Sequence, residues 1–486
     1  MSKKDKQELR QQIACEWLHE NYLQFGNLRH DVVADRLQVR CAHSLGEEAI
    51  GRLGERQELW RNLTDKDINT MVCQCVAESG VNISVTEMWT ALKSDMVPAV
   101  HPLRAWLQEL QPWTPDRPDW IDFIARQVHV KTNDTENKIQ QSKQLDLTTY
   151  SARNNTANGT GEYTYQQLET SNKNNSLPLG CVVPQRNVVE NNVVDVVVNN
   201  NPADTLWRAC FKKWFVAMVA SWMHDEVVNH TVLVLVGRQG IYKTTWLDHL
   251  IPPALRPYSS KLPLSGQISK DDRLRLCENG MLNIDELDAI CGREMNIMKS
   301  LLTSTDINER AAYGRLKERK VRLASFCAST NKREFLTDIT GNRRWLPFEV
   351  ESIQNPFYTT LPYEMMYAQA VYLVQNDFNY WFDMDEIEVM EQHNEDFRAQ
   401  ENEEQLLPIL FDIPAEGKGE FMTTAEISER LVTYGNIKKP MKTRQLGMLM
   451  AKKGFQKKQV FLSGTNVRGW MVYNRQIDEI KLAKKI

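Results

Sequence analysis

The stretch TVLVLVGRQGIYKTTWLDHL, residues 231–250, constrains the fold of this chain more than any other part of its sequence. A run of branched apolar residues, typical of a buried parallel strand, leads into a glycine turn, and a lysine then opens an apparent helix. In a phosphate-binding loop the turn lets backbone N–H groups converge on phosphates, and the lysine reaches the β- and γ-phosphates. The residues that such a loop would contribute here are Gly237, Gln239, Gly240, Tyr242, Lys243, Thr244 and Thr245.

Tyr242 departs from the usual pattern, in which a glycine stands directly before the lysine. A tyrosine adopts right-handed helical angles without strain, so we expect position 242 to belong already to the helix. The bulky side chain then takes up space beside the loop. Two interpretations stay open at this point, a working nucleotide site and a site that has degenerated.

A pair of carboxylates ends the next apolar run, GMLNIDEL. Asp285 and Glu286 follow Lys243 by about 42 residues and stand where a strand is expected to stop. One carboxylate can accept a hydrogen bond from a metal-bound water, and its neighbour can orient or deprotonate the attacking water. On a helix surface an acidic pair would be unremarkable, but at a strand end downstream of the loop it predicts a catalytic site.

Polar residues also end two later strand candidates. Asn331 ends VRLASFCASTN, where its amide can position a water near a γ-phosphate or simply form a turn. Arg343 and Arg344 precede the strand candidate WLPFEV. A guanidinium stabilises phosphoryl charge well, although one of the two arginines could instead be a surface residue paired with a carboxylate.

Length and local composition predict several domains in this chain of 486 residues. Residues 1–130 carry helical patterns, with one candidate hairpin in LQFGNLRHDVVADRLQVR. Between 131 and 200 there are thirteen asparagines, so we interpret 131–203 as a flexible insertion or linker. Residues 204–405 alternate apolar runs with helical stretches, which predicts an α/β sheet, opened by a helix that Asp204 and Thr205 cap.

Charge and cysteine usage exclude some classes of protein. The net charge of -4 argues against a uniformly basic coat for nucleic acid. The nine cysteines show no zinc-type spacing, and we interpret them as reduced thiols. The first residues lack an apolar signal core and no long apolar stretch occurs, so the expectation is a cytoplasmic protein without a membrane partner.

Basic residues concentrate in the C-terminal segment 406–486, where positions 415–486 hold 15 Lys and Arg against 6 Asp and Glu. A helix in FMTTAEISERLVTYG with Thr423 or Thr424 as its cap, a second helix in KTRQLGMLMAKKGF and a following hairpin give the order of a winged helix. In such modules the second helix enters the major groove and the hairpin contacts the DNA backbone. A winged helix that binds only protein is the alternative. The candidate DNA contacts are Lys442, Arg444, Lys452, Lys453 and Arg468.

These motifs, in this order, resemble those of superfamily-3 helicases of viruses and plasmids, and most closely the virulence-associated E family of phage and mobile-element ATPases. The resemblance covers roughly residues 98–405 and rests on GRQGIYKTT, NIDELD, NERAAYGRLKER and ASTNKREFLTDITGNRRWLPFEV. It implies that Tyr242 marks a branch of the family. It further implies ATP and Mg²⁺ as cofactors. Lys243 and Thr244 would be the Walker A pair and Asp285 and Glu286 the Walker B pair, with Thr244 and Asp285 as the magnesium ligands. Asn331 would be the sensor, Arg343 or Arg344 the arginine finger, and Arg310 a contact to nucleotide across an interface.

The implied fold is an α/β, AAA+-like P-loop ATPase core with a helical N-terminal domain and a C-terminal winged helix. The implied function is an ATP-dependent DNA helicase or translocase, a hexameric ring acting on single-stranded or forked DNA in replication of a phage or mobile element. The stretch around Lys317 to Lys320 is a candidate channel element. Residues 1–130 lack a paired-acid motif, so priming would come from a separate primase. The alternatives are an ATP-switched loader or regulator of replication or excision without unwinding, and a DNA-binding regulator with a degenerate nucleotide site.

Overall fold

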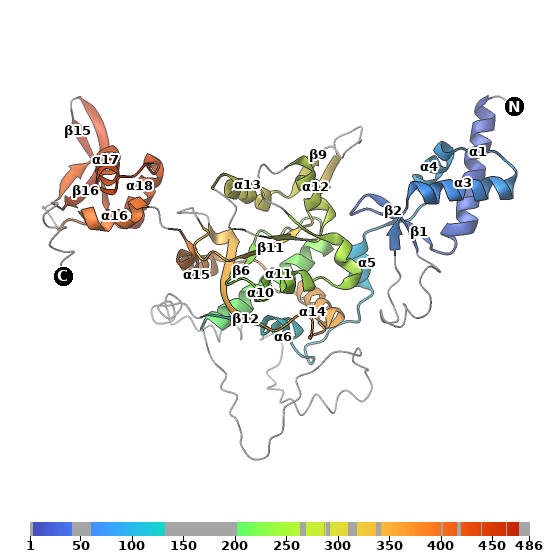
Figure 1. Ribbon diagram of the computed structural model, residues 1–486, viewed down its shortest axis with the longest axis horizontal. Coiled ribbons are helices and arrows are strands. Elements are labelled where there is room, and N and C mark those ends of the chain that lie inside the picture. Colours follow the sequence, from blue (N-terminus) through green and yellow to red (C-terminus); the bar gives the residue numbers. More distant parts are fainter. Residues whose placement is uncertain are drawn as a thin grey trace, which may run out of the picture. The chain divides into compact units, whose positions relative to one another are not determined.

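The computed structural model divides into two compact units, one made of residues 1–331 and 344–387 and the other of residues 332–343 and 388–486 (Figure 1). The predicted asparagine-rich insertion lies outside the described residues from position 132 to position 201. The structure describes residues 3–40, 60–131, 202–262, 269–285, 287, 292–309, 318–336, 342–399, 402–415, 419–438, 440–462 and 464–475.

The N-terminal part of the larger unit combines helices with a small sheet of order β3-β2-β1-β4. Its first two strands form the antiparallel hairpin expected from the sequence. The helices α1, α3 and α4 pack on one another around a core that includes Leu18, Met71 and Leu92. The bounds are α1 Lys3–Leu18, a π-helical turn His19–Leu23, β1 Leu28–Asp31, β2 Arg36–Arg40, β3 Trp60–Asn62, α3 Asp65–Ser79, α4 Val85–Leu92, β4 Ala99–Val100, α5 Pro102–Gln108 and α6 Trp120–Ala125.

Local sequence explains where α3 and α4 begin. Each helix starts at a capping box, in which a hydroxyl accepts the backbone N–H three residues on and an acidic side chain accepts the N–H of the cap. The pairs are Thr64 with Asp67 and Ser84 with Glu87. The helix α3 ends at Gly80, whose left-handed φ of 67° suits a glycine C-cap.

The larger unit is built on a six-stranded sheet in the order β5-β12-β6-β11-β8-β7. The strands from β12 to β7 are mutually parallel, and only the edge strand β5 pairs antiparallel. All residues of β6, β8 and β11 are buried, as continuous apolar runs in a covered parallel sheet should be. The predicted mixed α/β fold is confirmed, with strands β5 Val128–Val130, β6 Val232–Val236, β7 Ser259–Lys261, β8 Met281–Ile284, β11 Ser325–Thr330 and β12 Trp345–Ile353.

The helix α10, Pro202–Met223, joins the sheet to its neighbouring helices and packs against α6 and α14 (Figure 1). Three of its tryptophans donate their indole N–H to backbone carbonyls, Trp207 to Ala125 at 2.9 Å, Trp214 to Phe326 at 2.9 Å and Trp222 to Gly280 at 3.1 Å. Each of these large rings is therefore buried with its polar atom satisfied. The other helices of this unit are α11 Lys243–His249, the 3-10 turn Pro253–Tyr258, α12 Lys270–Glu278, α13 Gly292–Thr303 and α14 Tyr363–Gln375.

The predicted caps of α10 are wrong. The helix begins at Pro202, so Asp204 and Thr205 lie inside its first turn and do not precede it. Proline is favoured at the first helical position because its φ is already helical and its missing N–H would find no partner there.

A buried polar contact ties the N-terminal sheet to the strand β7. Asp31 is fully buried, and its carboxylate accepts the backbone N–H of Val33 at 2.9 Å and the hydroxyl of Tyr258 at 2.8 Å. Burial and the neighbouring Asp31 charge raise the pKa of Tyr258. Because Tyr258 directly precedes β7, the position of this strand is coupled to the N-terminal sheet.

A short antiparallel pair of strands, β9 Asp306–Glu309 and β10 Glu318–Val321, leads into β11. Arg322 follows β10 and is buried, where it hydrogen-bonds to backbone carbonyls. Its guanidinium donates to the carbonyls of Asn229 at 2.6 Å, Leu302 at 2.7 Å and Leu301 at 3.1 Å. This arginine fixes the end of α13 against the start of β11.

The smaller unit contains the predicted order of helix, helix and hairpin. The strand β16 pairs antiparallel with β13, β14 and β15. Of the two threonines proposed as cap of α17, Thr423 is the cap, in a capping box with Glu426. The bounds are α15 Met384–Asn394, which crosses the boundary between the units, then α16 Asn402–Leu410, β13 Phe411–Asp412, β14 Glu420–Met422, α17 Thr424–Gly435, α18 Thr443–Lys452, β15 Gln456–Leu462 and β16 Thr465–Asn474.

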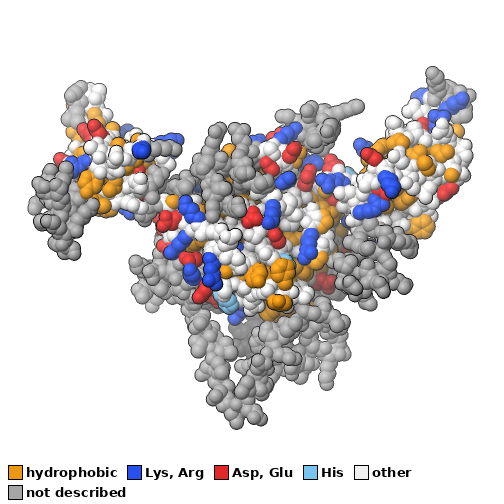
Figure 2. Space-filling view, viewed as in Figure 1, with side chains coloured by type: hydrophobic (Ala, Val, Ile, Leu, Met, Phe, Trp, Pro, Cys, Tyr) orange, Lys and Arg blue, Asp and Glu red, His pale blue; other side chains and the backbone are white. Residues whose placement is uncertain are grey.

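Basic and acidic side chains are interspersed on the face of the molecule drawn in Figure 2. This mixture agrees with the small net charge of -4 and shows no uniformly basic coat on that face. Among the helices that the structure describes, none has the length and apolar character needed to cross a membrane. Four of the six free cysteines that it describes are buried.

Candidate nucleotide site

Three adjacent parallel strands bring the predicted site residues to one edge of the sheet. In the sheet register Val236 at the end of β6 lies beside Thr330 of β11, and Ile284 at the end of β8 lies beside Ala328. The residues that follow, Gly237, Asp285 and Asn331, therefore emerge at the same carboxyl edge. In open α/β sheets this is the edge at which ligands bind.

Lys243 is held at the centre of this edge. Its side chain is almost fully buried, and its ammonium donates to the carbonyls of Gly237 at 2.7 Å and Arg238 at 2.8 Å, and to Oδ1 of Asn331 at 3.0 Å. The predicted Walker A lysine and the predicted sensor asparagine are thus in direct contact. The ammonium faces the interior of the loop, where a phosphate could replace the carbonyls as its partner.

The glycines of the loop are needed for two different reasons. A Cβ added at Gly237 would lie 2.8 Å from the carbonyl oxygen of Val350, so the close approach of β12 excludes a side chain there. Gly240 has a φ of 84°, which glycine adopts without strain. Gln239 and Gly240 are exposed and Thr245 is half-buried, so the outer side of the loop is open.

The conformation expected for Tyr242 is wrong. Its φ of 66° and ψ of 17° are left-handed, and it is the N-cap of α11, outside the helix proper. The loop must turn back sharply to place Lys243, and this turn requires the conformation that a glycine would supply. Tyrosine adopts it at a cost of about 1–2 kcal/mol.

Asp285 closes the other side of the site. Its Oδ1 accepts a hydrogen bond from the Thr244 hydroxyl at 3.3 Å and from the Ser329 hydroxyl at 3.4 Å, while these two hydroxyls lie 2.8 Å apart. The predicted Walker A and Walker B residues therefore meet directly. Ser329 joins them because it stands on β11, between β6 and β8.

Lys261 is a site residue that the sequence analysis missed. It ends β7, and its ammonium lies 2.9 Å from Oδ2 of Asp285. Burial tends to raise the pKa of Asp285, but Lys261 and the hydroxyls of Thr244 and Ser329 outweigh burial and hold that pKa below its usual value. Asp285 is therefore ionised at neutral pH. The contact arises only because β7 pairs with β8, which no local motif indicates.

The oxygen donors of this edge fit a magnesium ion. Mg²⁺ is usually bound by one or two carboxylates together with water and substrate phosphates, not by a cage of protein ligands. Asp285 and the Thr244 hydroxyl offer such a set. Over the described part of the chain there is no cluster of three or more His, Cys, Asp and Glu that could hold a metal ion without other ligands.

The structure describes only two of the four other predicted site residues. Glu286 and Arg310 lie outside the described residues. Arg343 is exposed and Arg344 half-buried, in the 3-10 turn Asn342–Arg344 that precedes β12. Neither guanidinium is buried, so an exposed arginine is present for a role at a neighbouring copy.

The candidate channel element around Lys317 to Lys320 is described only from residue 318 onward. Arg319 pairs with Asp306 at 2.6 Å, and Lys320 lies 3.4 Å from Asp35. These two basic groups are therefore partly neutralised within the same chain.

The candidate DNA contacts lie on the smaller unit, and all five are exposed. Lys452 lies 2.6 Å from Glu395, and Lys453 lies 3.8 Å from the buried Glu404. Lys442, Arg444 and Arg468 form no ion pair with another residue that the structure describes. The exposed basic residues thus fall into a paired and an unpaired group.

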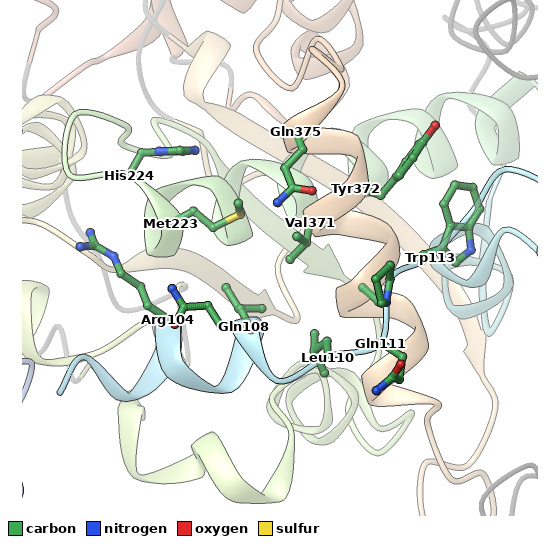
Figure 3. Close-up of a pocket in the computed structure, with 13 residues that line it drawn as sticks. Arg104, Gln108, Leu110, Gln111, Trp113, Met223, His224, Val371, Tyr372 and Gln375 are labelled. Carbon is green, nitrogen blue, oxygen red and sulfur yellow. The ribbon is translucent and has the colours of Figure 1, made fainter.

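A separate cavity of about 420 Å³ lies among α5, the end of α10 and α14 (Figure 3). Trp113 and Tyr372 line one side, with ring centroids 5.1 Å apart, and Arg104 and His224 line the other. Arg104 donates to the carbonyl of Trp222 at 2.9 Å and pairs with Asp225. The lining contains no carboxylate or thiol, and we assign it no chemistry.

The fold and this edge define a mixed α/β protein with a lysine-bearing glycine loop beside a strand-end carboxylate. Residues 183–399 match the family model described as the virulence-associated protein E-like domain. The resemblance to the virulence-associated E family that the motifs indicate is confirmed over these residues.

Comparison with solved structures gives distant similarities. Two apo structures of the NrS-1 C-terminal region, one of them in the A form, are each 10% identical and cover 94% of this chain and 99% of their own, with TM-scores of 0.39 and 0.38. A mutant of Thermotoga maritima RuvB is 11% identical over 57% of this chain and 94% of its own, with a TM-score of 0.21. No curated protein matches the chain.

Proposed function

We propose that this chain is an ATP hydrolase of the helicase type, which moves on single-stranded or forked DNA during replication of a phage or mobile element. The observation that carries the proposal is the convergence of Lys243, Thr244, Asp285 and Asn331 at one edge of the sheet. Lys243 and Thr244 open α11 after the loop that follows β6, while Asp285 and Asn331 directly follow β8 and β11, so chance juxtaposition is a poor explanation. The family assignment of residues 183–399 supports the same class.

In the proposed reaction each residue has a distinct task. Lys243 exchanges its loop carbonyls for the β- and γ-phosphates and neutralises charge that develops on them. Asp285 and the Thr244 hydroxyl would hold Mg²⁺, which when bound supplies further positive charge beside the phosphates. Asn331 orients the attacking water, and Glu286, by its resemblance to the Walker B glutamate, accepts its proton.

The proposed assembly is the AAA+-like hexameric ring that the family resemblance implies, with an ATP site between adjacent copies. The exposure of Arg343 supports a finger that reaches the nucleotide of the next copy. A head-to-tail interface of this kind closes into a ring when its rotation permits. The order of α17, α18 and the β15–β16 hairpin supports a winged helix that binds DNA.

The proposal is tested with Lys243→Ala and the matched control Lys270→Ala, which changes an exposed lysine at the start of α12. DNA-stimulated ATP hydrolysis and strand displacement on a forked duplex are measured with each protein. We expect Lys243→Ala to lose both activities but to retain DNA binding. The Lys270→Ala control should retain both activities and DNA binding.

The same assays, together with calorimetry of ATP binding and a measurement of DNA binding, separate the alternatives. Hydrolysis without strand displacement by the unaltered chain would identify an ATP-switched loader or regulator. Binding to DNA without any binding of ATP would identify a regulator with a degenerate site, and the proposal would then be wrong.

A further inference from the structure

An aromatic cluster adjoins the Lys243 loop, and the proposed reaction gives it no task. The rings of Tyr242 and Phe357 are nearly perpendicular, with centroids 6.4 Å apart, and the ring of His249 lies 5.5 Å from Phe357 in a similar arrangement. Tyr242 directly precedes Lys243, while Phe357 stands in the segment after β12. Two exposed rings from different parts of the chain thus meet beside the proposed phosphate site.

Exposure distinguishes this cluster from ordinary core packing. Tyr242 is 38% exposed and Phe357 is 69% exposed. Large apolar rings that stay in contact with water gain little from the hydrophobic effect, so burial does not explain why they stand here. Exposed aromatic rings are suited to stack on the base of a nucleotide.

One asparagine positions both rings. The side-chain amide of Asn355 donates to the Tyr242 hydroxyl at 3.3 Å, and its oxygen accepts the backbone N–H of Phe357 at 3.0 Å. The two rings are therefore oriented by a shared polar group. Such a support is expected where the orientation of an exposed ring matters.

The backbone of Tyr242 adds a separate observation. Its left-handed conformation is strained for tyrosine and would be free of strain for glycine. Strain of this kind persists when the side chain provides something that glycine cannot. In this loop the additional group is an exposed aromatic ring one residue from the lysine.

We infer that Tyr242 and Phe357 form a stacking platform for the base of the nucleotide whose phosphates bind at Lys243. The inference rests on the proposed function and specifies its base site. Aromatic side chains stack on any base because every base has a π-face, so the platform contributes affinity more than selectivity among bases. Asn355 is the positioning residue of the platform.

The experiment compares two ligands that share a triphosphate but differ in the base. Binding of ATP and of inorganic tripolyphosphate, each with Mg²⁺, is measured by calorimetry on the full chain. The variants are Tyr242→Gly, which suits the backbone, and Phe357→Ala. The matched control is Tyr358→Ala, which removes a neighbouring ring that is 83% exposed.

We expect Tyr242→Gly and Phe357→Ala to weaken ATP binding by roughly 5-fold to 150-fold, the range for loss of one base-stacking ring. Tripolyphosphate binding should stay within about twofold, because phosphate contacts come from the loop and Lys243. Tyr358→Ala should match the unaltered chain with both ligands.

Two results would overturn the platform while leaving the proposed function standing. One is an unchanged affinity of Tyr242→Gly for ATP. The other is an equal loss of affinity for both ligands, which would assign Tyr242 to the loop alone. Failure of the unaltered chain to bind either ligand would instead overturn the proposed function, and the platform with it.

Discussion

Polar side chains gather in two regions of the molecule in different ways. One region is the nucleotide edge, formed by Lys243, Thr244, Asp285 and Asn331. The other is the basic surface of the smaller unit, formed by Lys442, Arg444, Lys452, Lys453 and Arg468. At the nucleotide edge, complementary groups from distant parts of the sequence lie within hydrogen-bond distance of one another. On the basic surface the residues are close in sequence, and Lys452 and Lys453 contact acids of the same unit. Convergence of unlike groups is therefore stronger evidence for a site than a local count of charges.

The largest expected effect of a single change is on hydrolysis, in Asp285→Asn. The amide keeps the shape of the carboxylate but removes the charge that Thr244, Ser329 and Lys261 surround. Loss of one well-placed electrostatic group lowers turnover by about 100-fold or more. Steady-state ATP hydrolysis measures the effect, with the exposed Asp271→Asn as control. Equal activity of both variants would show that the convergence at this edge has no catalytic meaning.

A stability measurement tests whether a buried ion pair stabilises the fold of the smaller unit. Glu404 is buried and forms a two-point pair with the buried Arg398. Glu404→Ala removes the buried carboxylate of that guanidinium and leaves it only the partly exposed Glu395 at 3.1 Å, and breaking a buried pair costs about 3–5 kcal/mol. Hydrogen exchange of the amides in residues 402–475 should show faster opening throughout the unit.

The control for Glu404→Ala is Asp412→Ala, which removes the half-exposed partner of Arg475. An exposed ion pair contributes about 0–1 kcal/mol, so exchange should change little. A larger effect of Asp412→Ala than of Glu404→Ala would contradict a structural role for the Arg398 pair.

Lys261 gives a test based on pH. Lys261→Met removes the cation whose hydrogen bond and charge lower the pKa of Asp285, so burial then moves that pKa upward. Because the reaction needs ionised Asp285, activity is lost as pH falls through its folded pKa. The acidic limb of the ATPase profile should therefore lie at higher pH in Lys261→Met than in the unaltered chain. Lys261→Arg should restore the original profile, and superimposable profiles of all three would exclude this role.

Sequence patterns predicted β6, β8 and β11 and their shared carboxyl edge because each lies in a largely apolar run that ends at a glycine or a polar residue. They did not predict the conformation of Tyr242, since the turn is imposed by the whole loop and overrides the preference of one residue. Lys261 was missed because its partner Asp285 lies on a strand whose pairing with β7 is set by the sheet order. Charge along the chain predicted the basic surface, but the acids that pair with Lys452 and Lys453 come from Glu395 and Glu404, about fifty residues away.

The smallest expected effects concern DNA binding and separate the two groups of basic residues. Lys442 and Arg444 are exposed at the start of α18 and form no ion pair with any other described residue. Replacing either by Ala should lower the slope of log K against log salt by about 0.9, the value for one phosphate contact. Lys452→Ala and Lys453→Ala should change the slope less, because each ammonium already lies beside a carboxylate.

Binding of a fluorescent duplex over a series of salt concentrations measures all four slopes. Equal slopes would mean that DNA displaces Glu395 and Glu404 from the two lysines. An ion pair within the chain would then not prevent a basic group from contacting DNA. A lower slope only for Lys442→Ala and Arg444→Ala would place the contact surface at the start of α18. That result would show that a carboxylate beside a basic group limits the contribution of that group to DNA binding.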